Sequence, residues 1–287
     1  MKKAGIAILL LMVNLGFAQV NRFVYQASMK LDTHNKNDIK TEEVYLDISP
    51  EKTMFYSENR IKRDSIMRSH FQNGGARGFN REQMESLRSY FSYSIEKDKK
   101  NQKTFFKDRI GRDNYMYEED RPLNWAISSE TTKIGEYKVQ KADTDFGGRK
   151  WTAWFTTDLP YQDGPYKFGG LPGLIVKIED STGDYSFDLM RNYKIAEFPD
   201  VSSRGNIVKV KRKDFENQQA KFLKDPMEYM KQSMNSGGGR NFGGSGAPAA
   251  PMRVSGGRMD NPEMRKRMEE RMKEELKANN NPIEINK

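Results

Sequence analysis

The sequence of 287 residues contains no cysteine and only two histidines. The absence of cysteine excludes disulfide scaffolds, thiolate zinc sites, iron–sulfur clusters and thiol catalysis. The histidines, His34 and His70, leave little room for a metal site that needs several imidazole ligands. We therefore expect no cofactor. The chain does have many large side chains, since 16 Phe, 13 Tyr and 3 Trp are enough to build a hydrophobic core.

The longest apolar run lies at the start of the sequence. Lys2 and Lys3 precede the apolar stretch Ala4–Phe17, and Ala18 completes a pattern of small residues that is typical of a signal-peptide cleavage site. The stretch is shorter than the roughly 20 apolar residues that a membrane-spanning helix needs. We expect a signal peptide at 1–18 and an exported mature chain without a transmembrane segment. The protein would then be periplasmic, on the cell surface or secreted.

Positive charge is concentrated in the last third of the chain. Residues 200–287 carry 18 Lys or Arg and 12 Asp or Glu, and they supply most of the net charge of +9. Because the two signs are interleaved, we interpret this tail as a solvated surface. Peripheral contact of the basic tail with an anionic surface is the alternative. An exported protein rarely meets nucleic acid, so we expect no nucleic-acid partner.

Glycine marks the borders of the expected domains. Eight of the 21 residues from Gly237 to Gly257 are glycine, and such a stretch buries too little apolar surface to offset the entropy of ordering it. A shorter glycine-rich break at 73–78 predicts a surface loop. The predicted units are a signal peptide (1–18), a β-rich body (19–200), a helical extension (201–234), a flexible linker (235–261) and an amphipathic C-terminal helix with its tail (262–287). We expect the body to remain folded when 235–287 is deleted.

Most of the body has the period-two pattern of β-strands. Phe23, Tyr25 and Ala27 alternate with their neighbours, and turn residues separate many of the later segments. About ten such segments, with few helical patterns between them, predict a mainly β protein built on a largely antiparallel sheet that is curved or barrel-like. The other expected strands are 43–48, Lys52–Ser57, Tyr90–Glu96, Lys103–Asp108, Asn114–Tyr117, Glu136–Lys141, Arg149–Thr157, Leu174–Glu179 and Tyr185–Asn192.

Short helices are expected within and after the body. Helical spacing interrupts the strands twice, and proline suits the first position of two later helices. Asp214 is a suitable N-cap for the first helix that follows the body. The expected helices are 59–70, 81–88, 215–224, 226–234 and 262–278.

The most distinctive stretch of the sequence is Gly170, Leu171, Pro172, Gly173, Leu174 and Ile175. Pro172 and Gly173 fit the central positions of a type II turn, in which glycine takes a positive φ. A phosphate-binding loop is not expected, because a P-loop needs Gly-Lys-Ser/Thr at the start of a helix and a dinucleotide fingerprint needs glycines that open one. The motif therefore predicts a structural turn before a buried strand.

This stretch is the signature of the GLPGLI family of secreted bacterial proteins, and its surroundings resemble that family as well. The flanking segments that carry the resemblance are 125–127, 134–142 and 148–155, with Asp180 after the signature strand. The resemblance covers roughly 22–195. It implies an exported protein whose end is helical and rich in Met and Asn. Because the function of the family is uncharacterised, the resemblance implies no activity.

Aromatic residues near the signature suggest a binding surface. Trp151 and Trp154 are three residues apart on an expected strand, so they point to opposite faces. Either both faces are covered, which is the commoner case, or one tryptophan is exposed and offers a platform for a sugar or a peptide. Aromatic residues in the loop that follows suit recognition as well. The candidate surface consists of Arg149, Trp151, Trp154, Tyr161, Tyr166 and Phe168.

Carboxylates form three clusters, at 118–120, at Asp143 with Asp145, and at 179–184. None has the spacing of an EF-hand, but two carboxylates from different clusters could meet in the folded protein, so a carboxylate-dependent hydrolase is one alternative. Neither histidine lies in a recognisable catalytic setting. We therefore favour a protein without enzymatic activity.

Methionine is the least expected feature of the tail. Half of the 16 methionines lie between Met227 and Met272, and Met264, Met268 and Met272 are each four residues apart on the last expected helix. Thioether sulfur is a ligand for Cu(I), so periplasmic copper handling is a second alternative. We prefer an apolar stripe that docks on the body or on a partner, because methionine packs adaptably and no His or Cys supports the sulfur ligands.

The sequence thus predicts an exported binding or accessory protein of the cell envelope. Its partner would be an envelope protein or a small ligand. No motif in the sequence identifies that partner.

Overall fold

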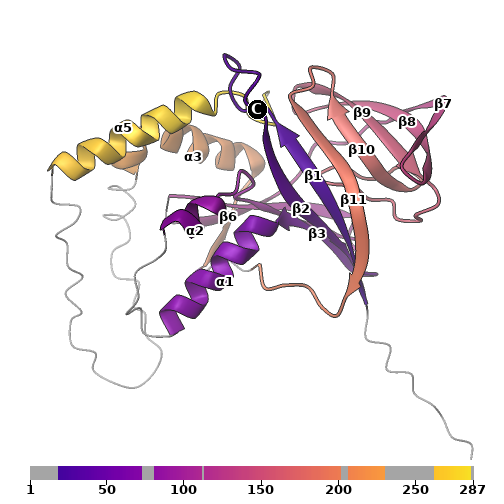
Figure 1. Cartoon of the computed structure of the whole chain (residues 1–287), viewed down its shortest axis with the longest axis horizontal. Helices are drawn as coiled ribbons and strands as arrows, with labels where there is room; N and C mark the ends of the chain where they lie inside the picture. Colours follow the sequence, from indigo (N-terminus) through magenta and orange to yellow (C-terminus); the bar gives the residue numbers. More distant parts are fainter. Residues whose placement is uncertain (1–18, 73–80, 112, 202–205, 230–261, 286–287) are drawn as a thin grey trace, which may run out of the picture.

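The structure is a computed structural model that describes residues 19–72, 81–111, 113–201, 206–229 and 262–285. The predicted signal peptide, the loop at 73–78 and the linker at 235–261 lie outside these residues. The strands are β1 (Val20–Met29), β2 (Lys40–Ile48), β3 (Lys52–Ser57), β4 (Ser94–Asp98), β5 (Lys103–Ile110), β6 (Asp113–Glu118), β7 (Ala126–Ile134), β8 (Tyr137–Phe146), β9 (Arg149–Thr156), β10 (Leu174–Asp180), β11 (Tyr185–Ile195) and β12 (Ile207–Lys209). The helices are α1 (Glu58–Gln72), α2 (Arg81–Ser86), α3 (Arg212–Lys224) and α5 (Pro262–Ala278), shown with the strands in Figure 1.

The twelve strands belong to one sheet, in the order β12-β6-β5-β4-β3-β2-β1-β11-β10-β9-β8-β7. Neighbouring strands run antiparallel except for β12, which pairs with β6 in parallel. The pairing of β1 with β11 joins the early strands of the body to the late ones. The predicted mainly β, largely antiparallel fold is confirmed. The sheet is open, with β12 and β7 at its edges, so the barrel-like alternative is wrong.

The main hydrophobic core lies on one face of the sheet, which we call the inner face. Phe23, Tyr25 and Ala27 of β1 all belong to this core, as their alternation predicts. Val24, which lies between them, belongs to a smaller cluster on the opposite face, where Ile61 of α1 packs. Burial of both faces explains why β1 has apolar residues in successive positions, not only in alternate ones.

Two strands that the structure contains have no counterpart among the predictions, namely β7 and β12. Each residue of β7 is exposed or half-buried, and all three residues of β12 are exposed. Both strands lie at the edges of the sheet, so they need no apolar face and leave no period-two pattern in the sequence. The strand predicted at Tyr90–Glu96 begins later, at Ser94.

The helices agree with the sequence patterns except at one N-terminus. α3 begins at Arg212, before the predicted N-cap Asp214, and Lys211 occupies the cap position without a side-chain hydrogen bond. Asp214 lies in the first turn, where a negative charge is favourable to the helix dipole. Of the helix expected at 226–234, residues 226–229 are helical and the others lie outside the described part of the chain.

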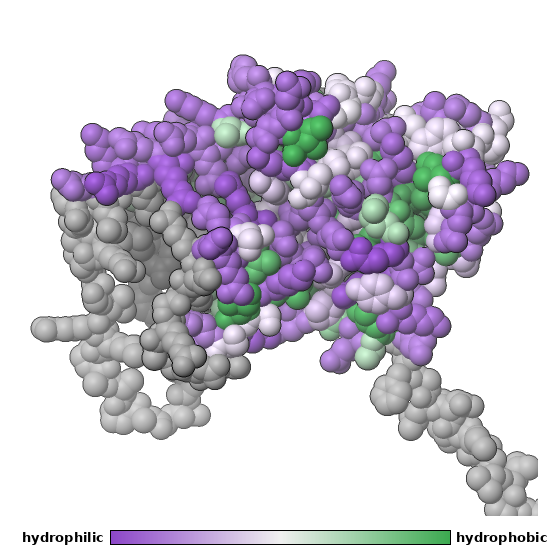
Figure 2. All heavy atoms as spheres, in the orientation of Figure 1, coloured by the Kyte–Doolittle hydropathy of each residue, from purple (hydrophilic) through white to green (hydrophobic). Residues whose placement is uncertain are grey.

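The surface is mostly hydrophilic in the view of Figure 2, where hydrophobic residues gather in small separate groups. Among the described residues, no helix combines the length and the apolar character that crossing a membrane requires. The larger apolar side chains instead lie on the inner face, together with the loop that connects β9 to β10.

Candidate functional site

The loop between β9 and β10, residues 157–173, folds back across the inner face. Asp163 fixes the loop in this position, because its carboxylate accepts hydrogen bonds from Thr53 Oγ1 at 2.5 Å and from Lys97 Nζ at 2.6 Å. Lys97 also donates to the carbonyl oxygen of Gly164 at 2.9 Å. Side chains from β3 and β4 thus hold the loop against the sheet.

The loop brings Lys167 into the hydrophobic core. The side chain of Lys167 is 1% exposed. Its ammonium lies 5.0 Å, 5.2 Å, 5.8 Å and 5.4 Å from the ring centroids of Phe106, Tyr117, Phe146 and Tyr166, respectively. Aromatic faces attract a cation at such distances. Tyr166, next to it, has a φ of 55°, a strained conformation that costs of order 1–3 kcal/mol and that the surrounding contacts must hold in place.

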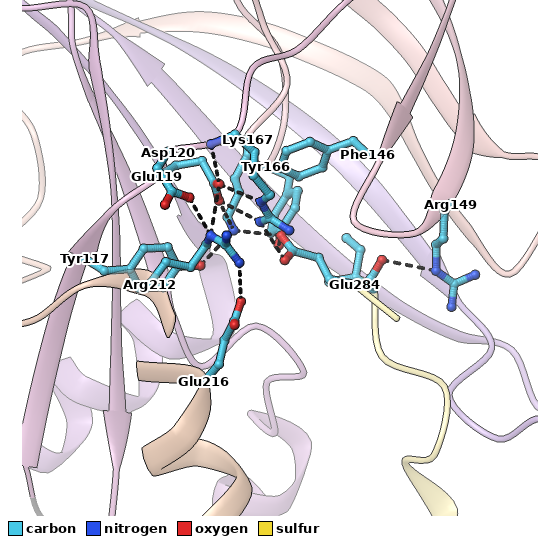
Figure 3. Close-up of polar contacts among 12 residues, drawn as sticks. Tyr117, Glu119, Asp120, Phe146, Arg149, Tyr166, Lys167, Arg212, Glu216 and Glu284 are labelled. Atoms are coloured by element: carbon cyan, nitrogen blue, oxygen red, sulfur yellow. Dashed lines mark hydrogen bonds and ion pairs between the residues drawn. The ribbon is translucent and has the colours of Figure 1, made fainter. Parts of the chain in front are cut away.

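The ammonium of Lys167 has two carboxylate partners (Figure 3). It donates to Glu119 Oε2 at 2.6 Å and to Glu284 Oε1 at 2.7 Å. It also donates to the hydroxyl of Tyr117 at 2.8 Å. Burial raises the pKa of Glu119, but the hydrogen bond from Arg121 and the charge of Lys167 outweigh burial and lower this pKa to about 2. Glu119 is therefore ionised at neutral pH.

Glu284 belongs to a different part of the chain from the rest of the site. It lies in residues Asn279–Ile285, which follow α5 without forming a helix or a strand and which we call the arm. Its carboxylate accepts hydrogen bonds from Tyr166 Oη at 2.5 Å and from Arg121 Nη2 at 2.8 Å, in addition to Lys167. Burial raises the pKa of Glu284, but the charges of Lys167 and Arg121 lower it below its usual value.

Arg149 holds the backbone of the arm. Its side chain is 4% exposed and forms an ion pair with Asp180 at 2.7 Å. Its Nε donates to the carbonyl oxygen of Ile283 at 3.1 Å, and its Nη2 donates to that of Pro282 at 2.8 Å. Nη2 also donates to Asn281 Oδ1 at 2.5 Å. One buried guanidinium thus contacts three successive residues of the arm.

The turn between β8 and β9 fits closely against the arm. The carbonyl oxygen of Gly147 accepts a hydrogen bond from the N–H of Ile285 at 2.8 Å. A Cβ atom on Gly147 would lie 2.7 Å from Cγ of Glu284, so only glycine leaves room for the arm here. The φ of Gly147, 61°, also favours glycine.

A cavity of about 610 Å³ lies beside the arm, between the inner face, α3 and α5. Most of its lining residues are aromatic or aliphatic, among them Phe91, Phe215, Leu276 and Ile283. Asp108 also lines it, and burial raises the pKa of this residue to about 6. Pockets for small ligands have volumes of about 300–1,000 Å³, so the cavity has such a size. We call the cavity and the adjoining surface that contacts the arm the cleft.

The glycines of the signature have separate steric roles. Gly170 has a φ of 86°, whereas Gly173 is not among the glycines with positive φ in the described residues. The predicted type II turn with a positive φ at Gly173 is therefore wrong. Gly173 is needed because a Cβ atom there would lie 2.0 Å from the carbonyl oxygen of Thr156. Beyond it, the carbonyl oxygen of Ile175 accepts a hydrogen bond from Tyr25 Oη at 2.7 Å, which fixes the signature strand to β1.

The residues of the predicted binding surface do not form an exposed platform. Four of them are at most 6% exposed, namely Arg149, Trp151, Tyr166 and Phe168. The other two, Trp154 and Tyr161, are partly exposed. The ring of Trp151 packs against that of Phe168 on the inner face, with 4.8 Å between centroids. Tyr166 and Phe168 are buried because the β9–β10 loop folds onto the inner face, and Arg149 is buried against the arm.

Two of the three acidic clusters of the sequence pair with cations, while Asp143 of the third accepts a hydrogen bond from Thr152 Oγ1 at 2.6 Å. Glu119 is bound to Lys167 at 2.6 Å. Asp180 and Asp184 lie 2.7 Å and 3.5 Å from Arg149. These contacts give the carboxylates a structural role and provide no support for the hydrolase hypothesis.

The copper hypothesis stays a prediction. Within the described residues, no group of three or more His, Cys, Asp or Glu could hold a metal ion. Met272 is half-buried on α5, but the side chains of Met264 and Met268 lie outside the described part of the structure.

Four residues of the site have no recognisable motif in the sequence, namely Lys167, Arg121, Asn281 and Glu284. The signal in the sequence was the position of Lys167, which is the one cationic residue of the loop 157–173 and lies between two aromatic residues. The arm has no periodic pattern, and its partners lie more than 100 residues away in the sequence. No spacing rule connects residues at that separation.

The fold and the cleft define the class of protein. It is a mainly β protein with an open, largely antiparallel sheet, and its cleft holds a segment of the same chain. A family profile described as a protein of unknown function (Porph_ging) matches residues 147–177. The matched segment begins at Gly147 and includes Arg149, Tyr166 and Lys167. It therefore carries much of the surface that contacts the arm.

No curated protein matches the chain. Two solved structures of PNGF-II, in the P21 and C2 space groups, resemble the fold with 20% sequence identity and a TM-score of 0.51. Each match covers 71% of this chain and 34% or 33% of the PNGF-II chain. The chain thus spans about a third of the length of these solved structures. At this identity the likeness concerns the fold alone.

Proposed function

We propose that this protein is an exported binding protein whose cleft takes up a short polypeptide segment that carries a carboxylate. The observation that carries the proposal is the position of Glu284. Its carboxylate receives hydrogen bonds from Lys167, Arg121 and Tyr166 at distances between 2.5 and 2.8 Å. The arm makes the contacts that a bound ligand would make, so the cleft is occupied by a segment of the same chain.

The chemistry of the contacts supports binding over simple core formation. A core element buries mainly apolar surface, whereas the arm is held by hydrogen bonds from charged side chains of the body. Without Glu284, Lys167 and Arg121 would share the single carboxylate of Glu119. A buried cation that lacks a partner is costly, so a cleft without the arm has affinity for another carboxylate.

Export and family membership are parts of the same proposal. The residues Lys2 and Lys3 followed by an apolar stretch support a signal peptide. The signature Gly170–Ile175 supports membership of the GLPGLI family, whose function is uncharacterised. A periplasmic, surface-bound or secreted protein would meet segments of envelope proteins, which suits an accessory role that requires binding and no catalysis.

The proposal is tested with the full-length protein and a fluorescein-labelled peptide that has the sequence of residues 279–285. Glu284→Ala weakens the arm within the chain and leaves the body of the cleft unchanged. We expect the labelled peptide to bind this variant at least about tenfold more tightly than the wild type, in which the tethered arm competes at high effective concentration. Fluorescence anisotropy measures both dissociation constants.

The matched control is Glu270→Ala, which removes a glutamate of α5 whose side chain is 60% exposed. This variant should bind the peptide like the wild type. Equal affinity of the wild type and Glu284→Ala for the peptide, or no binding to either protein, would refute the proposal.

A further inference from the structure

The arm is held at two positions, and the first is Asn281. This residue is 5% exposed, and its four hydrogen-bonding groups all have partners in the body. Its backbone N–H donates to the carbonyl oxygen of Leu31 at 2.9 Å, and its own carbonyl oxygen accepts from Tyr185 Oη at 2.6 Å. Its Nδ2 donates to the carbonyl oxygen of Lys30 at 2.7 Å, while its Oδ1 accepts from Arg149 at 2.5 Å. The site therefore requires a side chain with one donor and one acceptor.

An aspartate would not satisfy this first position. It has no donor for the carbonyl oxygen of Lys30, and the two oxygen atoms would then face each other without a proton between them. The position also lies close to two carboxylates that share Arg149, those of Asp180 and Asp184. Burial raises the pKa of Asp184. Hydrogen bonds, among them one with Asn281, outweigh burial and lower this pKa below its usual value. An added negative charge would be repelled there.

The second position is Glu284, three residues further along the arm. Its two oxygen atoms accept hydrogen bonds from Lys167, Tyr166 and Arg121. A glutamine at this position would direct an NH₂ group toward these donors. It would also lack the negative charge that pairs with Lys167 and Arg121. An aspartate is one methylene shorter than glutamate, and a backbone held by Arg149 cannot move to compensate.

The two residues between these positions contribute their main chain. The carbonyl oxygens of Pro282 and Ile283 both accept hydrogen bonds from Arg149. Every residue has such a carbonyl group, so these contacts select no side chain. They fix the distance along the chain from the first position to the second.

We infer that the cleft recognises a sequence motif, an asparagine followed three residues later by a glutamate, in a non-helical segment of another polypeptide. This inference rests on the proposed function and adds the chemical class of the ligand to it. The arm has this motif at Asn281 and Glu284, which explains how it occupies the cleft in the absence of a partner. The motif residues are recognised through side chains, and the spacer is recognised through its backbone.

The inference is tested with the full-length Glu284→Ala protein and a set of labelled peptides derived from residues 279–285. Three peptides alter the motif, through Asn281→Asp, through Glu284→Gln, or through one glycine inserted between Pro282 and Ile283. We expect each change to weaken binding at least about tenfold, because each removes a hydrogen bond to a charged group or leaves a buried polar group without a partner. Ile285→Ala is the control peptide, since this residue is 52% exposed, and its affinity should stay within about twofold.

The outcomes separate the inference from the function on which it rests. If the unaltered peptide does not bind, the proposed function fails. If the unaltered peptide binds and the three altered peptides bind equally well, the inference alone is wrong and the cleft accepts polypeptide without this motif. Circular dichroism verifies that Glu284→Ala is folded, and full-length Asn281→Ala replaces it if it is not.

Discussion

At the scale of single residues, the residue type that a position requires often depends on a neighbour that is distant in the sequence. Gly170 and Gly173 both look like turn residues in the signature. The structure separates them, since Gly170 needs its positive φ and Gly173 needs the absence of a Cβ beside Thr156. Local turn chemistry predicts a positive φ within the signature but places it at Gly173, whereas Gly170 has it. The requirement at Gly173 depends on how closely β9 and β10 approach each other, which a motif does not encode.

This difference gives a testable order of stabilities. Gly170→Ala puts a side chain into open space but strains the backbone, and it should lower the free energy of unfolding by about 1–2 kcal/mol. Gly173→Ala places a methyl group 2.0 Å from a carbonyl oxygen, so the backbone must shift and the loss should be about 3 kcal/mol or more. Urea unfolding of the two variants measures both values. A smaller loss for Gly173→Ala than for Gly170→Ala would contradict the packing argument.

At the scale of elements, the regular parts of the fold could be predicted and the irregular parts that form the site could not. The alternation in β1 and the span of β3 follow from apolar patterning, as does the helix that begins at Pro262. The β9–β10 loop and the arm have no period. Their positions depend on buried ion pairs such as Lys97 with Asp163 and Lys167 with Glu284. Such pairs form only after the sheet has brought distant segments together.

The ion pairs between the loop and the arm predict how stability depends on pH. The pKa values of Glu119 and Glu284 are lower in the folded protein than the usual value of about 4.3. A carboxyl group with a lowered pKa contributes its full stabilisation above its unfolded pKa, and this contribution is lost as pH falls toward the folded value. Stability should therefore decline below about pH 4.5, down to the pKa of about 2 for Glu119. Glu284→Gln should show a smaller decline than the wild type.

The measurement is urea unfolding of both proteins at pH 7, 5 and 3. Asp108 acts in the opposite sense, because its raised pKa of about 6 favours the folded state as pH falls from 6 toward 4. This effect is present in both proteins, so it cancels in the comparison. Glu270→Gln is the control for loss of one exposed carboxylate, and identical pH profiles for Glu284→Gln and the wild type would show that the arm is not held by its charge.

At the scale of the whole molecule, the C-terminal segment of α5 and the arm, which we call the tail here, contacts the body mainly through the arm. Two ion pairs join α5 to the body, Arg88 with Glu275 and Arg271 with Glu85, and all four side chains are at least 45% exposed. Exposed pairs of this kind contribute about 0–1 kcal/mol. The arm instead provides acceptors for three cations of the body, those of Arg121, Arg149 and Lys167. Seven residues near the end of the sequence therefore account for most of the tail's contacts with the site.

Deleting 235–287 should leave a folded body, as the composition of the chain predicts, but a less stable one. Loss of the arm leaves Lys167 and Arg121 with the single carboxylate of Glu119. One positive charge then has no partner, and breaking a buried pair in this way costs up to about 3–5 kcal/mol. The arm peptide supplied in solution should restore this stability by an amount that rises with the logarithm of its concentration, because a ligand that binds only the folded state stabilises it by mass action. Urea unfolding at increasing peptide concentration measures the effect. A truncated chain that does not fold at any peptide concentration, or one whose stability is independent of the peptide, would show that the arm is a fixed part of the core and not an exchangeable ligand.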